Sequence, residues 1–381
     1  MEQPYSGVTI LDLTHDLGRY AGRLFADLGA QVIRIEPPGG LADRRAAQEE
    51  APPGAAPAAY EFEFLNASKL SRVIDTATQA GRTAFASLLA ESQVVLLERD
   101  GPLFDELEWV KSLASAVVVT SVSPFGRSGP WADAPSSDLV LQAAGGIAWL
   151  SGRLDGPPLR LPGSQATMIT GVYAAVATAV ALHDTLASGR GHVVDVSAQE
   201  CIAHSLQNSI QVFDFEDRIS MRGGEGTRDC SEDMFACKDG LIFLAAPRTL
   251  GVSWNALVQW MRDAGHPSAE ELSAGRWSDR TWRMTGEAKR AFRATLESFT
   301  KDYTKEQLTE EGIRRKVVLG PVSTVRDVFD DPQLLHRQYF QTVTPAQGAH
   351  PLKFPGAPYR LSEPVWRVAA AAPLGHPEQS R

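Results

Sequence analysis

Residues 138–200 read DLVLQAAGGIAWLSGRLDGPPLRLPGSQATMITGVYAAVATAVALHDTLASGRGHVVDVSAQE, with a Gly-Gly pair after a short apolar run and then a Pro-Pro turn. The long segment that follows is apolar almost all round, which predicts a helix buried between layers. A Gly-Arg-Gly turn at 189–191 ends the connection, and VVDVS at 193–197 predicts a strand. Ser197 followed by Glu200 fits a capping box, a role for Glu200 that we prefer to catalysis.

The first 40 residues predict a strand, a helix and a second strand. Branched apolar residues in GVTILDLTHD, 7–16, predict the first strand, and apolar residues at helical spacing over 20–28 predict a helix that Gly29 ends. QVIRIE at 31–36 predicts the second strand. Units of this length form right-handed crossovers between parallel strands. No GxGxxG separates the first strand from the helix, so dinucleotide binding is disfavoured.

Two near-continuous apolar runs predict further strands: VVLLE at 94–98 and AVVVTSVSP at 116–124. Such uninterrupted runs are typical of a parallel sheet that is covered on both faces. Residues 41–60 are dominated by Ala, Pro, Glu and Gln, and we interpret them as a surface loop. The fold class is therefore α/β.

The composition changes after about residue 205. Residues 214–240 are polar, charged and rich in glycine, which indicates a linker or a mobile loop. Three of its glycines, which allow backbone conformations that other residues avoid, are Gly223, Gly224 and Gly226. Beyond this segment, LIFLAA at 241–246 predicts a strand, and apolar residues at helical spacing predict helices over 254–261 and 292–299.

The charge balance and the cysteines limit the classes of function. Lys and Arg number 37 against 46 Asp and Glu, and a formal charge of −9 argues against nucleic-acid binding, which usually needs a basic face. The cysteines show no CxxC spacing, and the start of the chain lacks the pattern of a signal peptide, so we expect a cytoplasmic location and no metal site. The longest apolar run, 172–182, is shorter than the roughly 20 residues of a bilayer span, so no membrane role is expected.

Several motifs occur in one order along nearly the whole chain. They are LDLTHDLGRYAGRLFADLGAQVIRIEPPGG at 11–40, LNASKLSRVID at 65–75, SPFGRSGPW at 123–131, the segment 138–200, VVLGPVSTVRDVFDDPQLLHRQYF at 317–340 and LKFPGAPYRLSEP at 352–364. Together they resemble CoA-transferase family III, which includes formyl-CoA and carnitine CoA-transferases and methylacyl-CoA racemases. The resemblance implies an enzyme that uses CoA or acyl-CoA as substrate and holds no permanent cofactor.

The resemblance also implies a domain organisation. A Rossmann-like large domain is built from both chain ends, residues 1–205 and the return segment 317–381. A linker, 206–229, leads to a small inserted α+β domain, 230–316. Relatives form interlocked dimers in which two ring-like chains thread each other, so a dimer is expected here.

Relatives exchange CoA between carboxylic acids through a single aspartate, and the matching position here is Thr167. No acidic residue occurs from 156 to 182, so a shift of the alignment by one residue does not supply an aspartate. A threonine hydroxyl needs a neighbouring base to be acylated, and none is visible nearby in the sequence. We therefore prefer a pocket-lining or capping role for Thr167. The resemblance also disfavours the racemase branch, because its catalytic histidine would fall at Ser137 and its aspartate again at Thr167.

The resemblance implies a set of residues that bind the substrate or CoA: His15, Leu17, Gly18, Lys69, Arg99, Asp138 and Gln165. Leu17 stands where formyl-CoA transferases have a glutamine, and Arg99 with Asp100 replaces an Asn-Phe pair of the CoA site. Lys69 is a candidate contact for the phosphates or adenine of CoA, and a solvated surface lysine is an equal alternative.

Residues 163–166, GSQA, and the start LGRYAG at 17–22 resemble a subgroup that lacks the aspartate. It includes one subunit of the heteromeric benzylsuccinate CoA-transferases, whose partner subunit carries the aspartate. This predicts an interlocked homodimer, or a heteromer with an Asp-bearing homologue. Two alternatives stay open: an enzyme whose pocket serves other chemistry through polar groups such as His15 and Gln165, and a binding or scaffold protein without turnover.

Overall fold

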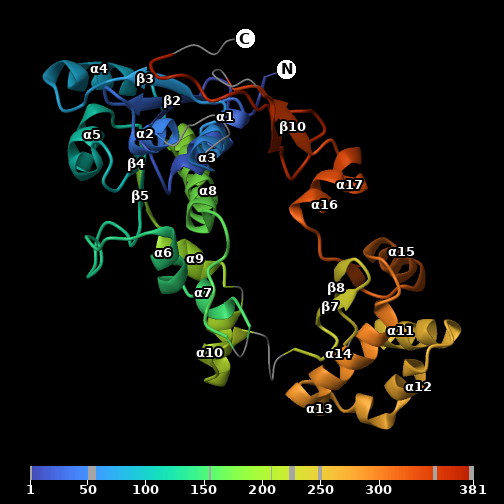
Figure 1. Ribbon diagram of the computed structural model, residues 1–381. Coiled ribbons are helices and arrows are strands. Elements are labelled where there is room, and N and C mark those ends of the chain that lie inside the picture. Colours follow the sequence, from blue (N-terminus) through green and yellow to red (C-terminus); the bar gives the residue numbers. More distant parts are fainter. Residues whose placement is uncertain are drawn as a thin grey trace. The chain divides into compact units, whose positions relative to one another are not determined.

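The computed structural model describes residues 2–49, 57–153, 156–206, 208–222, 228–247, 251–345 and 350–376 (Figure 1). The chain divides into two compact units. The first consists of Met1–Ser151, Pro158–Asp217 and Leu335–Arg381, and the second of Gly152–Pro157 and Arg218–Leu334. The glycine loop that contains Gly223, Gly224 and Gly226 lies outside the described residues.

A six-stranded parallel sheet forms the centre of the first unit. Its strands are β1 (Thr9–Asp12), β2 (Gln31–Glu36), β3 (Leu70–Val73), β4 (Val94–Glu98), β5 (Val118–Ser123) and β6 (His192–Ser197). The spatial order is β3-β2-β1-β4-β5-β6. This is the order of a doubly wound nucleotide-binding fold, and it confirms the predicted parallel α/β sheet.

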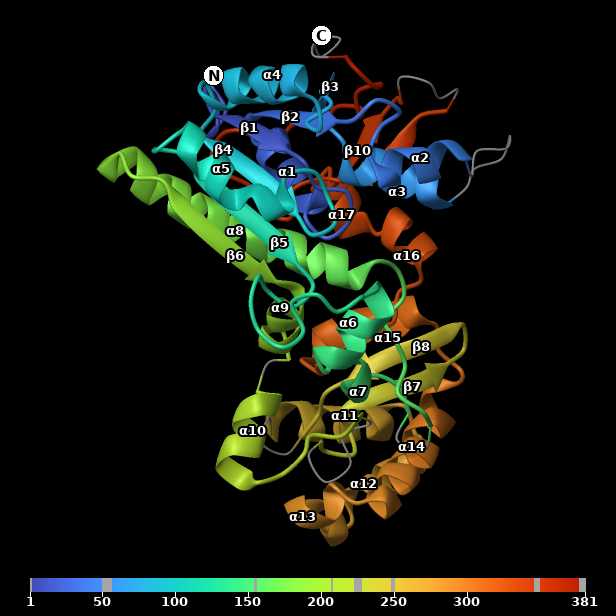
Figure 2. The same cartoon turned by 90° about the vertical axis from the view of Figure 1, so that its left-hand side faces the viewer.

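Helices cover both faces of this sheet. One face packs against α1 (Arg19–Asp27) and α8 (Gln165–Ser188), and the other against α4 (Gln79–Leu89) and α5 (Leu107–Leu113). Ile10 of β1 belongs to the first of these cores and its neighbour Leu11 to the second, because successive strand residues point to opposite faces. Figure 2 shows α8 running alongside β5 and β6.

Helix α8 has 24 residues, and Gly189 is its C-cap. The φ of Gly189 is 72°, a left-handed backbone conformation that glycine adopts at little steric cost. It is the one helix among the described residues that is long and apolar enough to cross a membrane by length and composition. Half of its most apolar window is buried inside the chain. At its start, Gly171 lies so close to α1 that a Cβ atom there would be 2.6 Å from the Cβ of Tyr20.

The predicted surface loop at 41–60 is wrong, because two helices occupy its described residues. They are α2 (Ala42–Glu49) and α3 (Pro57–Leu65). Alanine, arginine and glutamate are good helix formers, and Arg44 of α2 anchors this segment through an ion pair of 2.6 Å with the buried Glu36. The remaining helices of this part of the chain are α6 (Asp138–Ala144), α7 (Ile147–Leu150), α9 (Ala198–His204) and α10 (Ser209–Glu216).

The end of the chain packs against its beginning in the first unit. Strands β10 (Phe340–Val343) and β11 (Leu352–Pro355) form an antiparallel pair. Farther on, Ser68 and Ala369 exchange two hydrogen bonds of 2.9 Å, and Ser71 bonds to Gly375 and His376. Both chain ends therefore build one unit.

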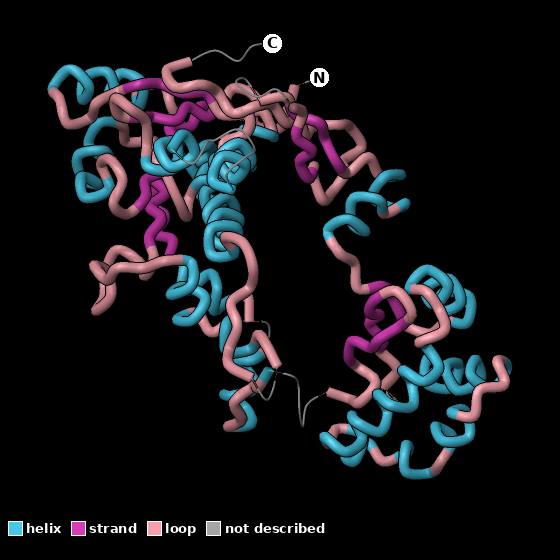
Figure 3. The backbone as a smooth tube through the Cα atoms, in the orientation of Figure 1, coloured by secondary structure: helices cyan, strands magenta, loops and turns pink. Residues whose placement is uncertain are grey.

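The second unit consists of a small antiparallel sheet and several helices (Figure 3). The sheet has the order β7 (Asp233–Cys237), β8 (Gly240–Leu244) and β9 (Leu319–Pro321). The helices are α11 (Gly251–Asp263), α12 (Ser268–Ser273), α13 (Arg280–Arg283), α14 (Gly286–Thr300), α15 (Lys305–Arg315) and α16 (Val325–Asp330), and α17 (Pro332–His336) follows. Their core is rich in aromatic residues such as Trp254, Trp277 and Phe292.

The units and the predicted segments do not share all their boundaries. Residues 209–216 of the predicted linker form α10, which belongs to the first unit. Residues 317–334 of the predicted return segment belong to the second unit, because β9 pairs with β8 there. The domain boundaries 205, 229 and 316 stay a prediction from the sequence.

Candidate functional site

The candidate site lies where the strand order of the large sheet reverses, between β1 and β4. To one side of β1 the order runs to β2 and β3, and to the other it runs to β4, β5 and β6. In open parallel sheets, ligands bind in the crevice outside the carboxyl ends of the strands at such a switch point. Strand β1 ends at Asp12 and β4 at Glu98, and residues 13–18 connect β1 to α1. This connection contains three predicted site residues.

Glu98, the last residue of β4, accepts hydrogen bonds from the backbone of that connection. Its side chain is 3% exposed, and its two carboxylate oxygens accept hydrogen bonds from three successive backbone N–H groups. The distances are 2.7 Å from His15, 3.0 Å from Asp16 and 2.6 Å from Leu17. Gly18 adds a longer contact of 3.5 Å. His15, Leu17 and Gly18, predicted as contacts for the substrate, therefore surround a carboxylate of the chain itself.

Burial raises the pKa of Glu98, because the charged form loses its hydration there. The nearby His15 opposes this rise, with its Nδ1 atom 3.8 Å from a carboxylate oxygen, while the charge of Asp16 adds to it. The backbone N–H groups also favour the charged form. Charge-assisted bonds of this kind are among the strong hydrogen bonds of proteins.

Thr167 lies in the first turn of α8 and is 2% exposed. Its hydroxyl donates a hydrogen bond of 3.1 Å to the carboxylate of Asp16, whose side chain is 58% exposed. Thr167 and the connection after β1, which are 151 residues apart in the sequence, are thus in direct contact. The acidic group missing from 156–182 is supplied next to Thr167 by another part of the chain.

Arg19 joins this contact to a second carboxylate. Its guanidinium lies 3.6 Å from Asp16 and 2.8 Å from Glu61 of α3, and its side chain is 8% exposed. Ser164, directly before α8, donates to both carboxylate oxygens of Glu61 at 3.1 Å. The start of α8 is therefore connected to α1 and α3 through charged and polar side chains.

Asp138 and Gln165 have structural contacts at the same helix start. One oxygen of Asp138 accepts a hydrogen bond of 2.8 Å from the backbone N–H of Ala166, one of the groups that has no partner within the helix. The other accepts 2.6 Å from the Gln142 side chain. Gln165 donates to the carbonyl of Pro162 at 2.9 Å. Asp138 thus acts as a helix cap supplied from a different helix.

The ion pairs of Lys69 and Arg99 are with residues other than those that contact Thr167. The Lys69 ammonium has no exposed surface and forms an ion pair of 2.8 Å with Asp12. Burial lowers the pKa of Lys69 to about 8, although the charge of Asp12 opposes this effect. A contact between Lys69 and CoA stays a prediction, and it would require the ammonium to leave this pair. Arg99 forms an ion pair of 2.6 Å with the exposed Asp133.

The sequence did not single out Asp16, Glu98 and Glu61. Asp16 contacts Thr167 and Glu98 contacts the backbone of His15, both predicted site residues, whereas Glu61 contacts Arg19. Glu98 carried a usable signal, since it is the charged residue that ends an otherwise apolar predicted strand. Asp16 and Glu61 carried none. Their contacts form across 151 and 103 residues of sequence.

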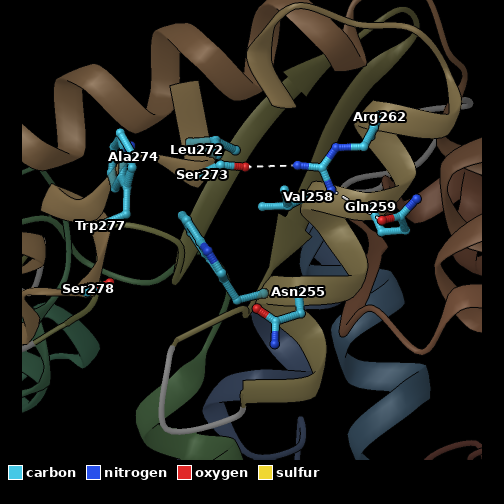
Figure 4. Close-up of a pocket in the computed structure, with 10 residues that line it drawn as sticks. Asn255, Val258, Gln259, Arg262, Leu272, Ser273, Ala274, Trp277 and Ser278 are labelled. Atoms are coloured by element: carbon cyan, nitrogen blue, oxygen red, sulfur yellow. Dashed lines mark hydrogen bonds between the residues drawn. The ribbon is translucent and has the colours of Figure 1, made fainter. Parts of the chain in front are cut away.

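A separate cavity of about 350 Å³ lies in the second unit (Figure 4). Trp254, Val258 and Trp277 contribute to its wall, and Arg262 donates to Ser273 at 3.1 Å. None of the predicted site residues lines it. Within the parts of the chain that the structure describes, no group of three or more His, Cys, Asp or Glu residues could hold a metal ion.

The fold and this site define an α/β protein whose candidate site lies at the switch point of a parallel sheet. The model of CoA-transferase family III matches residues 5–377, so this chain belongs to CoA-transferase family III. The family predicted from the motifs is confirmed, and the chain is a CoA-transferase-type enzyme.

Individual relatives agree with this assignment. The chain is 34% identical over 381 residues to the succinyl-CoA:(R)-benzylsuccinate CoA-transferase subunit BbsE of Thauera aromatica, covering 98% of this chain and 92% of that protein. It is 26% identical to succinyl-CoA:mesaconate CoA-transferase of Haloarcula marismortui, covering 96% and 92%. A solved CAIB/BAIF family protein from Brucella suis matches with a TM-score of 0.82 and 27% identity, covering 98% and 97%.

Proposed function

We propose that this chain is the subunit of a heteromeric CoA-transferase that lacks the acyl-carrying aspartate. A homologous chain, with aspartate at the position of Thr167, would supply that carboxylate. The reaction would move CoA from a thioester such as succinyl-CoA to a second carboxylic acid. The likeness to BbsE, a subunit of a succinyl-CoA-dependent transferase, supports this assignment.

The single observation that carries the proposal is the state of Thr167. Its hydroxyl is almost fully buried and is already used as a donor to Asp16. The Arg19 guanidinium of the same network is paired with Asp16 and Glu61. Thr167 and Arg19 therefore have partners already, and the buried hydroxyl of Thr167 offers little surface to an incoming thioester.

The chemistry of CoA exchange also distinguishes threonine from aspartate. A carboxylate attacks the thioester carbonyl, releases CoA thiolate and holds the acyl group as a mixed anhydride. The thiolate then attacks the carboxylate's own carbonyl carbon, which releases the first acid and leaves CoA on the enzyme as a thioester. An ester on Thr167 could return only the same acyl group to CoA, because a hydroxyl oxygen has no carbonyl carbon to bear CoA.

The test is to produce this chain alone and together with an Asp-bearing homologue encoded beside it. We expect no transfer from succinyl-CoA to other acids by the chain alone, and transfer by the pair. Replacing the homologue's aspartate by alanine should lower kcat of the pair by about 10³-fold or more. Thr167→Val in this chain should leave that rate within about threefold, because no covalent step uses its hydroxyl.

Thr167→Asp provides the complementary measurement. If this chain has kept a CoA pocket, the variant should form a CoA thioester on residue 167, detectable as added mass on the protein after incubation with acyl-CoA. Transfer by the unmodified chain alone, at the rate of the pair, would contradict the proposal. We expect the two chains together to form a dimer, and native mass spectrometry would separate a heteromer from a homodimer by the summed mass of its chains.

A further inference from the structure

The position that Glu98 occupies is normally a position for ligands. In doubly wound sheets, the backbone N–H groups after the first strand and at the start of the first helix point toward a ligand's phosphate. Here the corresponding connection runs from β1 to α1 beside the switch point. Its N–H groups at His15, Asp16 and Leu17 all point to one carboxylate that belongs to the chain.

We propose that Glu98 is an internal anion that replaces a ligand's phosphate in this set of N–H groups, and that it is the positioning residue for the connection carrying Asp16. This role is independent of which subunit carries the nucleophilic aspartate. Glu98 anchors the connection through the backbone N–H groups of that connection. In a variant that lacks the Glu98 carboxylate, the same N–H groups can bind a small carboxylate or another compact anion.

The contacts explain how one carboxylate orients the whole connection. His15, Asp16 and Leu17 donate through their backbone N–H groups. The backbone conformation of the turn, which these bonds hold, therefore sets the direction of the three side chains. Leu17 is 4% exposed and packs in the core, while the side chain of Asp16, the residue before it, is 58% exposed and contacts Thr167. Glycine at residue 18 leaves room for Thr14 in this turn, since a Cβ there would be 2.5 Å from Cγ2 of Thr14 and would force that side chain to move.

The strength of the effect follows from burial. Glu98 is 2% exposed, so removing its carboxylate leaves three donors that water reaches poorly. Buried N–H groups without an acceptor are strongly unfavourable, and a bond to a charged acceptor is stronger than one to a neutral acceptor. A neutral amide in place of the carboxylate would also direct its own NH₂ group toward backbone donors.

The first experiment is chemical rescue of Glu98→Ala. Loss of the carboxylate should lower the melting temperature by about 5–10 °C. Sodium formate should restore about half of this loss in a saturable way, since it binds the folded state at the vacated position. Formamide and sodium chloride at the same concentration should not. Glu108→Ala is the matched control, because that side chain is 82% exposed, and formate should not affect it.

The second experiment remains informative if Glu98→Ala does not fold. Hydrogen exchange of residues 12–18 should be about tenfold or more faster in Glu98→Gln than in the wild type, whereas Glu98→Asp, which keeps the charge, should fall between them. Rescue by formamide equal to that by formate would overturn the proposal. Wild-type protection of residues 12–18 in Glu98→Gln would overturn it as well.

Discussion

Several charged side chains of the first unit are fully buried, and each has a partner of opposite charge. Arg34 and Asp43 form two hydrogen bonds of 2.9 and 2.8 Å with side-chain exposures of 1% and 4%. Lys69 is paired with Asp12 in the same way. Removing one partner of a buried pair is costly, typically about 3–5 kcal/mol, because the other charge stays buried without compensation. The pair of Arg34 with Asp43 therefore contributes to the position of α2 against the sheet.

Asp43 should make stability depend on pH in the acid range. Burial alone would raise its pKa, but the Arg34 guanidinium, with smaller contributions from Arg19 and Asn66, outweighs burial and holds the pKa at about 2, below its ordinary value of 3.8. The contribution of the carboxylate is therefore fully present above pH 3.8 and is lost as the pH falls toward 2. It should amount to about 2 kcal/mol in the free energy of unfolding.

Urea unfolding of Asp43→Asn between pH 7 and pH 2.5 checks this expectation. The variant should be less stable at pH 7, and its stability should fall less steeply below pH 4 than that of the wild type. Asp100→Asn is the control, since that side chain is 87% exposed. Parallel curves for wild type and Asp43→Asn would refute the assigned pKa.

At the scale of elements, the contact between α1 and α8 places Thr167 beside the connection after β1. The two helices approach closely at Gly171, where a Cβ atom would lie 2.6 Å from the Cβ of Tyr20 and 3.2 Å from the backbone nitrogen of Ala21. Backbone atoms cannot move aside as the end of a flexible side chain can. Glycine is therefore required at this crossing by space and not by its backbone angles.

Gly171→Ala should lower the free energy of unfolding by about 1–3 kcal/mol, because overpacking forces the helices apart. Alanine would otherwise stabilise a helix by about 1 kcal/mol relative to glycine. Gly251→Ala is a matched control at the first residue of α11, where nothing lies within 4 Å of the added Cβ. Denaturant unfolding measures both, and equal stability of the two variants would contradict the close approach.

At the scale of the whole molecule, the two ends of the chain complete one unit. The carbonyl of Ala372 accepts a hydrogen bond from the Arg44 guanidinium, and the N–H of Ala372 donates to the carbonyl of Lys69. Arg367 donates its backbone N–H to Asp27, and the Gln3 side chain donates to the carbonyl of Val365. The last described segment therefore supplies hydrogen-bond partners to polar groups of α1, of α2 and of the residue directly before β3.

A chain that ends at residue 364 should lose most of the stability of the first unit, by about 5 kcal/mol or more, since several buried polar groups would lose their partners. A chain that ends at residue 376 keeps all of the contacts above and should unfold like the full chain. The measurement is the urea midpoint and the soluble yield of both. Equal midpoints would show that the first unit is complete without residues 365–376.

Periodicity and composition predicted much of the sheet correctly. The strands at 31–36 and 94–98 have the bounds that their apolar runs indicated, and Gly29 ends α1 with a φ of 101°. The helices at 42–49 and 57–65 were missed, because an Ala- and Pro-rich composition is compatible with both loop and helix. What stabilises α2 is the pair of Arg44 with Glu36, which the local pattern does not contain.

The sequence by itself determined the parallel α/β sheet and the family, since these depend on residues that are near each other in the chain or on ordered motifs. That Thr167 stands at the position of the acyl-carrying aspartate stays a prediction from the motifs. Only the tertiary structure decided that Asp16 contacts Thr167 and that Glu98 anchors the connection between β1 and α1. The reason is physical. Adjacent parallel strands bring their carboxyl ends to one edge of the sheet, and there residues more than 80 positions apart in the sequence meet. A buried carboxylate at this edge, such as that of Glu98, must find hydrogen-bond partners there.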